Sequence, residues 1–120
     1  MKILITGING FAASHLARKL LDRGHEVHGT IRVRSDLHRI EKIRDKLTLH
    51  YAELTDPVCI RNLLAKEKFG QIYHVAAQSF VKTSWSAPLE TFATNVDGTI
   101  AMFEALRQME TPPKVLITST

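Results

Sequence analysis

Two glycines near the amino terminus have the spacing of a phosphate-binding turn. Gly7 and Gly10 separate a short apolar run, residues 2–6, from a segment of helical periodicity, residues 10–23. Glycine adopts the backbone angles of a tight turn and lets the main chain approach a pyrophosphate, while the next helix offers free N–H groups. The context favours a dinucleotide-binding turn over a purely structural one. Its predicted cofactor contacts are Gly7, Asn9, Gly10, Phe11 and Ala12.

Basic residues follow the second apolar run, at the position that selects between the two nicotinamide cofactors. An Asp or Glu here accepts a hydrogen bond from the ribose of NAD, whereas an Arg pairs with the 2′-phosphate of NADP. The chain has Arg32 and Arg34, and a charge-assisted contact of this kind gives a preference of roughly 10- to 150-fold. We therefore predict NADP in preference to NAD, with Arg32 as the ligand. Asp36 nearby opposes this prediction, and its alternative is that both arginines are solvated loop charges.

Strand-like runs and helical periods alternate along the whole chain and must position these residues. Strands are predicted at residues 2–6, 26–31, 47–51, 71–75 and 114–118. Helices are predicted at residues 10–23, 36–46, 88–108 and from Pro57 onward, the last capped by Thr55 or Asp56. Such alternation produces a parallel sheet, because each helical crossover returns the chain to the same edge. We predict one α/β domain over residues 1–120, a Rossmann-type doubly wound sheet of order 3-2-1-4-5.

Composition excludes several other classes. The chain is 44% apolar and 23% charged, and no apolar stretch approaches the roughly 20 residues of a membrane span or forms a signal peptide. Its single cysteine, Cys59, fits a reducing cytoplasm. The net charge of +4 comes from basic residues interleaved with acids, typical of a solvated helix face and not of a nucleic-acid site. The six histidines lack metal-ligand spacing, so we expect surface or strand-end positions and no metal.

With these motifs the chain resembles the extended short-chain dehydrogenase/reductase family. Residues 6–13 are similar to its Thr-Gly-x-x-Gly-x-x-Gly signature, with Ala13 replacing the last glycine. Glu53-Leu54 stands where the family has Asp-Leu, whose acid contacts the adenine, and the longer side chain is a departure. Residues 75–79 resemble the segment beneath the nicotinamide side of the cofactor. The resemblance implies further cofactor contacts at Glu53, Leu54, Ala76, Ala77 and Ser79.

Within that family, three segments are similar to GDP-mannose 4,6-dehydratases and GDP-4-keto-6-deoxymannose reductases. They are residues 74–81, 84–85 and 94–96. The resemblance implies GDP-mannose or a related nucleotide sugar as substrate, contacted by Ser79, Val81 and Ser84, and a cofactor contact at Asn95. Two alternatives remain open, because Asn95 could be a satisfied buried amide and Ser84 could cap the next helix.

The dehydratase reaction implied by the resemblance oxidises the sugar at C4 by hydride transfer to NADP, eliminates water across C5–C6 and returns the hydride to C6. The family pattern places the catalytic hydroxyl at Thr120, with Ser119 as second choice. The family's Tyr-x-x-x-Lys pair is absent here, since neither Tyr51 nor Tyr73 has Lys four residues later. We therefore expect the amino-terminal part of a longer enzyme, truncated before the substrate domain and inactive on its own.

Three functions compete on this reading. The first is the dehydratase, with the reductase or another nucleotide-sugar epimerase or dehydratase as close rivals. The second is a non-catalytic NADP-binding module, and the third is a basic nucleic-acid or scaffold domain, which the charge pattern disfavours. The helix predicted over residues 88–108 resembles one that family members use for dimerisation, so a homo-oligomer is expected, although its apolar stripe could instead pack on the sheet.

Overall fold

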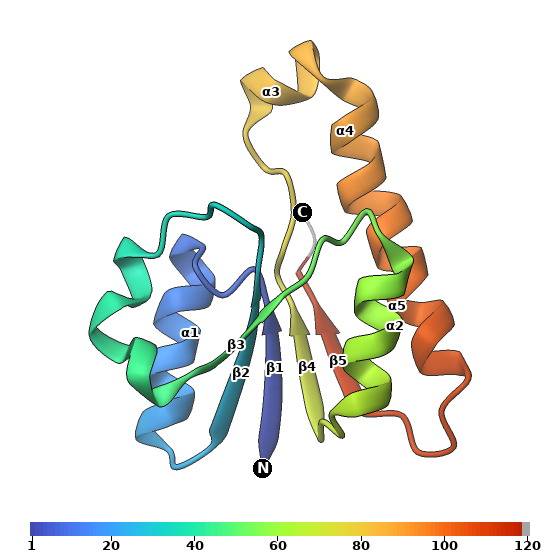
Figure 1. Ribbon diagram of the computed structural model, residues 1–120. Helices are drawn as coiled ribbons and strands as arrows, with labels where there is room; N and C mark the ends of the chain where they lie inside the picture. The colour runs from blue at the N-terminus through green and yellow to red at the C-terminus, as the bar shows by residue number, and fades with distance from the viewer. Residues whose placement is uncertain (119–120) are drawn as a thin grey trace.

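Five parallel strands form one sheet in the order β3-β2-β1-β4-β5, which confirms the predicted doubly wound fold. The computed structural model describes residues 1–118. Figure 1 shows the strands side by side with their carboxyl ends at one edge. Their bounds are β1 Lys2–Thr6, β2 Glu26–Ile31, β3 Thr48–Tyr51, β4 Gln71–His74 and β5 Lys114–Ile117.

Helices cover both faces of the sheet (Figure 1). One face carries α1 (Phe11–Asp22) and the 3₁₀ helix η1 (His38–Lys46), and the other carries α2 (Pro57–Lys66) and α5 (Gly98–Arg107). The remaining elements are α3 (Val81–Ser86), α4 (Pro88–Phe92) and the π turn η2 (Ala93–Asp97). No helix in the described part of the chain is long and apolar enough to cross a membrane.

The apolar run of β1 is buried on both of its faces. Ile3 and Ile5 pack in the core beneath α1, whereas Leu4 packs with the helices on the opposite face. Each of these three side chains is at most 1% exposed. Burial on both faces explains why the strand reads as a continuous apolar run instead of an alternating pattern.

The ends of α1 and α2 follow from their capping residues. Gly24 has φ +81°, and the N–H groups of Gly24 and His25 donate to the carbonyls of Leu21 and Leu20 at 2.9 and 3.1 Å. This is the hydrogen-bond pattern of a Schellman cap. At the start of α2, the carboxylate of Asp56 accepts from the Val58 N–H at 3.0 Å, so Asp56 and not Thr55 is the cap.

One prediction about a helix was wrong. Residues 38–46 form a 3₁₀ helix and not an α-helix, in which only Ile40 is buried. The apolar residues here recur at spacings of three, which match the three residues per turn of a 3₁₀ helix. At the start of α1, Phe11 is 70% exposed, and its ring contacts that of His15 edge-on.

The helix predicted over residues 88–108 is a run of α4, the π turn η2 and α5. The apolar stripe expected along it mostly faces away from the core, since Phe92, Val96, Ile100 and Phe103 are each at least 36% exposed. Gly98, Met102 and Leu106 are the buried positions of α5. The sequence thus located the helical region correctly. Of the two alternatives that it left open for the apolar stripe, packing on the sheet does not hold for these four residues.

One histidine departs from the predicted surface or strand-end placement. His28 lies in the middle of β2 and is 2% exposed. Its ring nitrogens lie 2.8 Å from His50 Nε2 and 2.8 Å from Glu26 Oε1, so both have hydrogen-bond partners. Pairing of both nitrogens lets this polar ring occupy the core.

Candidate functional site

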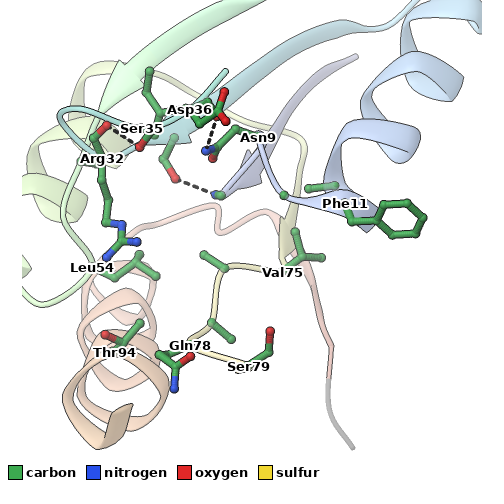
Figure 2. A pocket seen from close by; sticks show the side chains of 18 of the residues that line it. Asn9, Phe11, Arg32, Ser35, Asp36, Leu54, Val75, Gln78, Ser79 and Thr94 are labelled. Carbon is green, nitrogen blue, oxygen red and sulfur yellow. Dashed lines mark hydrogen bonds between the residues drawn. The ribbon is translucent and has the colours of Figure 1, made fainter. Parts of the chain in front are cut away.

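A cleft of about 740 Å³ opens at the carboxyl ends of the strands (Figure 2). It lies above β1 and β4, where the strand order reverses, which is the position at which doubly wound sheets hold ligands. The structure brings most of the predicted cofactor residues into its lining, namely Gly7, Asn9, Gly10, Phe11, Ala12, Arg32, Glu53, Leu54, Ala76, Ala77 and Ser79. Their convergence supports the predicted site, while their contacts with a cofactor stay predictions.

The glycine turn forms the floor of the cleft and is packed closely between Thr30 and Ala76. Gly7 has φ +64°, its N–H donates to Thr30 Oγ1 at 3.0 Å, and its carbonyl accepts from the Gly10 N–H at 2.9 Å. A Cβ atom at Gly7 would lie 3.0 Å from the Cβ of Ala76. The turn is thus held between β2 and the segment after β4, with no space for a side chain.

The amino terminus of α1 opens into the cleft without a cap. No side chain of the described residues caps it, and its first turn contains no acidic residue. The Ser14 N–H makes the first intrahelical bond, to the Gly10 carbonyl at 2.9 Å. The preceding N–H groups, those of Phe11, Ala12 and Ala13, have no acceptor within the helix, so together with the helix dipole they favour an anion.

A cluster of basic residues lines the other end of the cleft. Arg32 extends into it from the end of β2 (Figure 2), and Arg34, Ser35 and Arg39 also line it. Sequence reasoning missed Ser35 and Arg39. A signal for Arg39 was available, since the first turn of a helix that follows β2 lies next to the loop containing Arg32.

Asp36 also lines the cleft, but its carboxylate is engaged locally. It accepts a hydrogen bond from the His38 N–H at 3.0 Å and lies 2.9 Å from His38 Nδ1. These hydrogen bonds, first from the backbone and then from the ring of His38, hold the pKa of Asp36 below its ordinary value. The carbonyl of Asp36 accepts from Asn9 Nδ2 at 3.1 Å, which links the glycine turn to the basic loop.

The opposite wall is the segment that follows β4, and Asn95 holds it in place. Asn95 Oδ1 accepts from the Gln78 N–H at 2.8 Å, and its Nδ2 donates to the Gln78 carbonyl at 3.0 Å. Its neighbour Thr94 lines the cleft, whereas Asn95 is not part of the lining. This arrangement favours the satisfied-amide alternative left open by the sequence, and direct contact of Asn95 with a cofactor stays a prediction.

The remaining predicted residues lie beyond the cleft. Val81 and Ser84 belong to α3, and Ser84 Oγ donates to the Val81 carbonyl at 2.5 Å. Ser84 does not cap the next helix, because α4 begins at Pro88 without a side-chain cap. Contact of Val81 and Ser84 with the substrate stays a prediction. Thr120, the predicted catalytic hydroxyl, lies outside the described residues.

The parallel doubly wound sheet, with its glycine turn at the switch point, defines a domain of the Rossmann type. The sequence model of the family described as GDP-mannose 4,6 dehydratase matches residues 4–120, so the chain belongs to that family.

A curated relative agrees with this assignment, and solved structures of epimerases share the fold. The GDP-mannose 4,6 dehydratase of Homo sapiens is 38% identical over 116 residues, which cover 87% of this chain and 31% of the relative. The UDP-Glc/GlcNAc 4-epimerase of Campylobacter jejuni superposes with a TM-score of 0.88 at 28% identity, covering 98% of this chain and 36% of that one. The UDP-glucose 4-epimerase of Thermus thermophilus, solved in complex with NAD, gives 0.80 at 28% identity, covering 90% and 34%. The chain spans between 19% and 32% of the length of the curated relatives that it matches.

Proposed function

We propose that this chain forms the NADP-binding part of a nucleotide-sugar dehydratase that acts on GDP-mannose. The observation that carries the proposal is the cleft itself, where an uncapped helix terminus and a glycine turn face the basic residues Arg32, Arg34 and Arg39. An anion site at one end and a second positive cluster at the other suit a dinucleotide that carries an additional phosphate. Membership in the GDP-mannose 4,6-dehydratase family supports the sugar and the reaction.

The residues present fit this cofactor. The volume of about 740 Å³ lies within the range of roughly 300 to 1,000 Å³ common to ligand sites. We assign the pyrophosphate to the amino terminus of α1, the adenine to Glu53 and Leu54, and the 2′-phosphate to Arg32. The nicotinamide half is then assigned to residues 76–79.

When bound, NADP would supply the hydride acceptor for oxidation of the sugar at C4 and the hydride for reduction at C6, with water lost across C5–C6 between the two. Ser79, Val81 and Ser84 would contact the nucleotide sugar, and the hydroxyl of Thr120 would hydrogen-bond the reacting oxygen. Neither Tyr51 nor Tyr73 has Lys four residues later. We therefore propose cofactor binding for this chain and dehydration for the whole protein to which the cleft belongs. Its single cysteine supports a cytoplasmic location.

Binding and turnover test the two halves of the proposal separately. Calorimetric titration of this chain is expected to show NADP binding more tightly than NAD, by roughly 10-fold or more. The protein expressed with the coding sequence downstream of Thr120 is expected to convert GDP-mannose to its 4-keto-6-deoxy product when NADP is present. Absence of binding to either cofactor would refute the proposal for this chain.

The turnover assay also separates the rival functions. Conversion of GDP-4-keto-6-deoxymannose with NADPH, without any conversion of GDP-mannose, would identify the reductase. Action on another nucleotide sugar would identify a different epimerase or dehydratase. Binding of NADP with no turnover by the extended protein would leave a non-catalytic cofactor-binding module.

A second copy of the chain is the partner that we propose for the outer face of α4 and α5. Leu89, Phe92, Ile100 and Phe103 are 85%, 63%, 55% and 43% exposed, and an apolar surface of this kind marks an interaction site. The resemblance of this helix to one used for dimerisation in the family supports a homo-oligomer.

Ile100→Glu is expected to dissociate such a dimer, because it would bury an unpaired carboxylate at the interface. Light scattering after size-exclusion chromatography measures the mass directly. Val58→Glu is the matched control, since Val58 is 47% exposed on α2. A wild-type monomer, or equal dissociation by both substitutions, would contradict this assignment.

A further inference from the structure

A buried histidine lies directly beneath the wall of the cleft, and the proposed function does not use it. His74 ends β4 and is 3% exposed. Its Nδ1 atom lies 2.9 Å from Thr6 Oγ1, and its Nε2 atom lies 3.1 Å from Thr99 Oγ1. The ring therefore joins the end of β1 to the first turn of α5.

The hydrogen bonds of Thr6 fix the state of this ring. The Thr6 hydroxyl accepts from the N–H groups of Val75 and Ala76, each at 3.1 Å. A hydroxyl has two lone pairs and one proton, so its acceptor capacity is filled and its own proton must be donated. His74 Nδ1, at 2.9 Å, accepts the hydrogen bond from that proton. Nδ1 is therefore an acceptor and carries no proton.

The same direction of donation continues to the π turn. With Nδ1 bare, the neutral ring carries its proton on Nε2 and donates it to Thr99 Oγ1. The Thr99 hydroxyl in turn donates to the Asn95 carbonyl at 2.8 Å. Burial lowers the pKa of His74, which favours the same neutral ring. A second proton, on Nδ1, would place an N–H donor of the ring opposite the donating hydroxyl of Thr6.

We propose that this chain of hydrogen bonds, Thr6–His74–Thr99–Asn95, positions the nicotinamide side of the cofactor cleft. We name it the histidine relay. At one end Thr6 holds the Ala76 N–H, and at the other Asn95 holds both backbone groups of Gln78. The wall between these two points lies against the glycine turn, since an added Cβ at Gly7 would be 3.0 Å from the Ala76 Cβ. His74 and Thr99 are thus positioning residues, which hold the backbone of residues 76–78 in place without touching the reacting atoms.

The first experiment determines the tautomer of His74 and needs no ligand. NMR of the ring nitrogens at neutral pH is expected to show a neutral ring with its proton on Nε2. A ring protonated on Nδ1, or on both nitrogens, would overturn the relay, because the hydroxyl of Thr6 could not then satisfy all of its neighbours.

The second experiment separates the nicotinamide side of the cleft from the adenine side, and it rests on the proposed function. The probes are NADP, which spans the cleft, and 2′,5′-ADP, which lacks the nicotinamide half. Thr99→Val keeps the shape of the side chain and leaves the His74 Nε2–H without an acceptor. It is expected to weaken NADP binding by roughly tenfold while leaving 2′,5′-ADP binding unchanged, and Thr99→Ser is expected to restore it.

The outcomes distinguish the two proposals. Equal loss of both probes in Thr99→Val would show general destabilisation, and unchanged binding of both would show that the relay does not set the cleft, so either overturns the positioning role. If Thr99→Val does not fold, wild-type affinities in Thr99→Ser still support the role of the hydroxyl. A selective loss of NADP affinity in Thr99→Ser overturns that role. If the unaltered chain binds neither probe, the proposed function fails and the positioning role with it, while the tautomer still decides whether the relay exists.

Discussion

Gly7→Ala is expected to weaken NADP binding by roughly a hundredfold, equivalent to about 2.7 kcal/mol. Gly7 has φ +64°, a conformation that costs an alanine about 1–2 kcal/mol. The added Cβ would lie 3.0 Å from the Cβ and 3.1 Å from the Cα of Ala76, so relief of the contact must move backbone. That movement displaces the wall of the cleft away from the floor on which the pyrophosphate is proposed to lie. Calorimetry measures the affinity, and urea unfolding measures the accompanying loss of stability.

Gly24→Ala is the control that isolates the cost of the backbone angle. Gly24 has φ +81°, and an added Cβ there would have no heavy atom within 4 Å. This substitution is expected to lower the free energy of unfolding by about 1–2 kcal/mol and to leave NADP affinity unchanged. A similar loss of affinity in both variants would show that general stability, and not the close contact at Gly7, controls binding.

The sheet was predictable because its signals are local and its topology follows from few rules. A buried parallel strand such as β1 reads as an apolar run, and the helix between two strands fixes their parallel direction. The Schellman cap at Gly24 was predictable for the same reason, since a glycine at the end of a helical period has a specific backbone role.

What covers a helix is not a local property, and here the sequence left two alternatives open. The apolar stripe along residues 88–108 shows that one face seeks an apolar partner, but periodicity does not identify that partner. The core contacts of α5 come instead from Gly98, Met102 and Leu106. The small residue Gly98 lies close to Leu54, where an added Cβ would be 3.1 Å from the Leu54 Cβ. Such a contact depends on a loop more than 40 residues away.

The candidate site also has parts that could be predicted from local sequence and parts that could not. The glycine turn and the basic loop were predictable because each is a short segment whose chemistry is contained in its own residues. The link from Thr6 through His74 to Thr99 was not, because its members lie 68 and 25 residues apart. Neither the signature that contains Thr6 nor the segment that contains His74 indicates that the two side chains meet. Only the parallel pairing of β1 with β4 brings Thr6 next to His74.

Arg32→Ala and Arg39→Ala are each expected to reduce the preference for NADP over NAD. Both side chains line the cleft beside Ser35. Loss of one charge-assisted contact to a phosphate, about 1.5–3 kcal/mol, weakens NADP binding by roughly 10- to 150-fold. NAD has no 2′-phosphate, so its affinity is expected to stay nearly constant. Titration of each variant with both cofactors at one fixed salt concentration measures the ratio.

Arg61→Ala is the matched control, because Arg61 is an exposed residue of α2 that does not line the cleft. It removes the same charge from the chain and is expected to change neither affinity. Equal loss of NADP and NAD in Arg32→Ala would place its guanidinium at a group common to both cofactors, such as the pyrophosphate. An unchanged ratio in both cleft variants would mean that these arginines are solvated loop charges, and the choice of NADP would then have no support in this loop. Since Asp36 is already engaged by His38, its carboxylate is not expected to take over the selection of NAD in either variant.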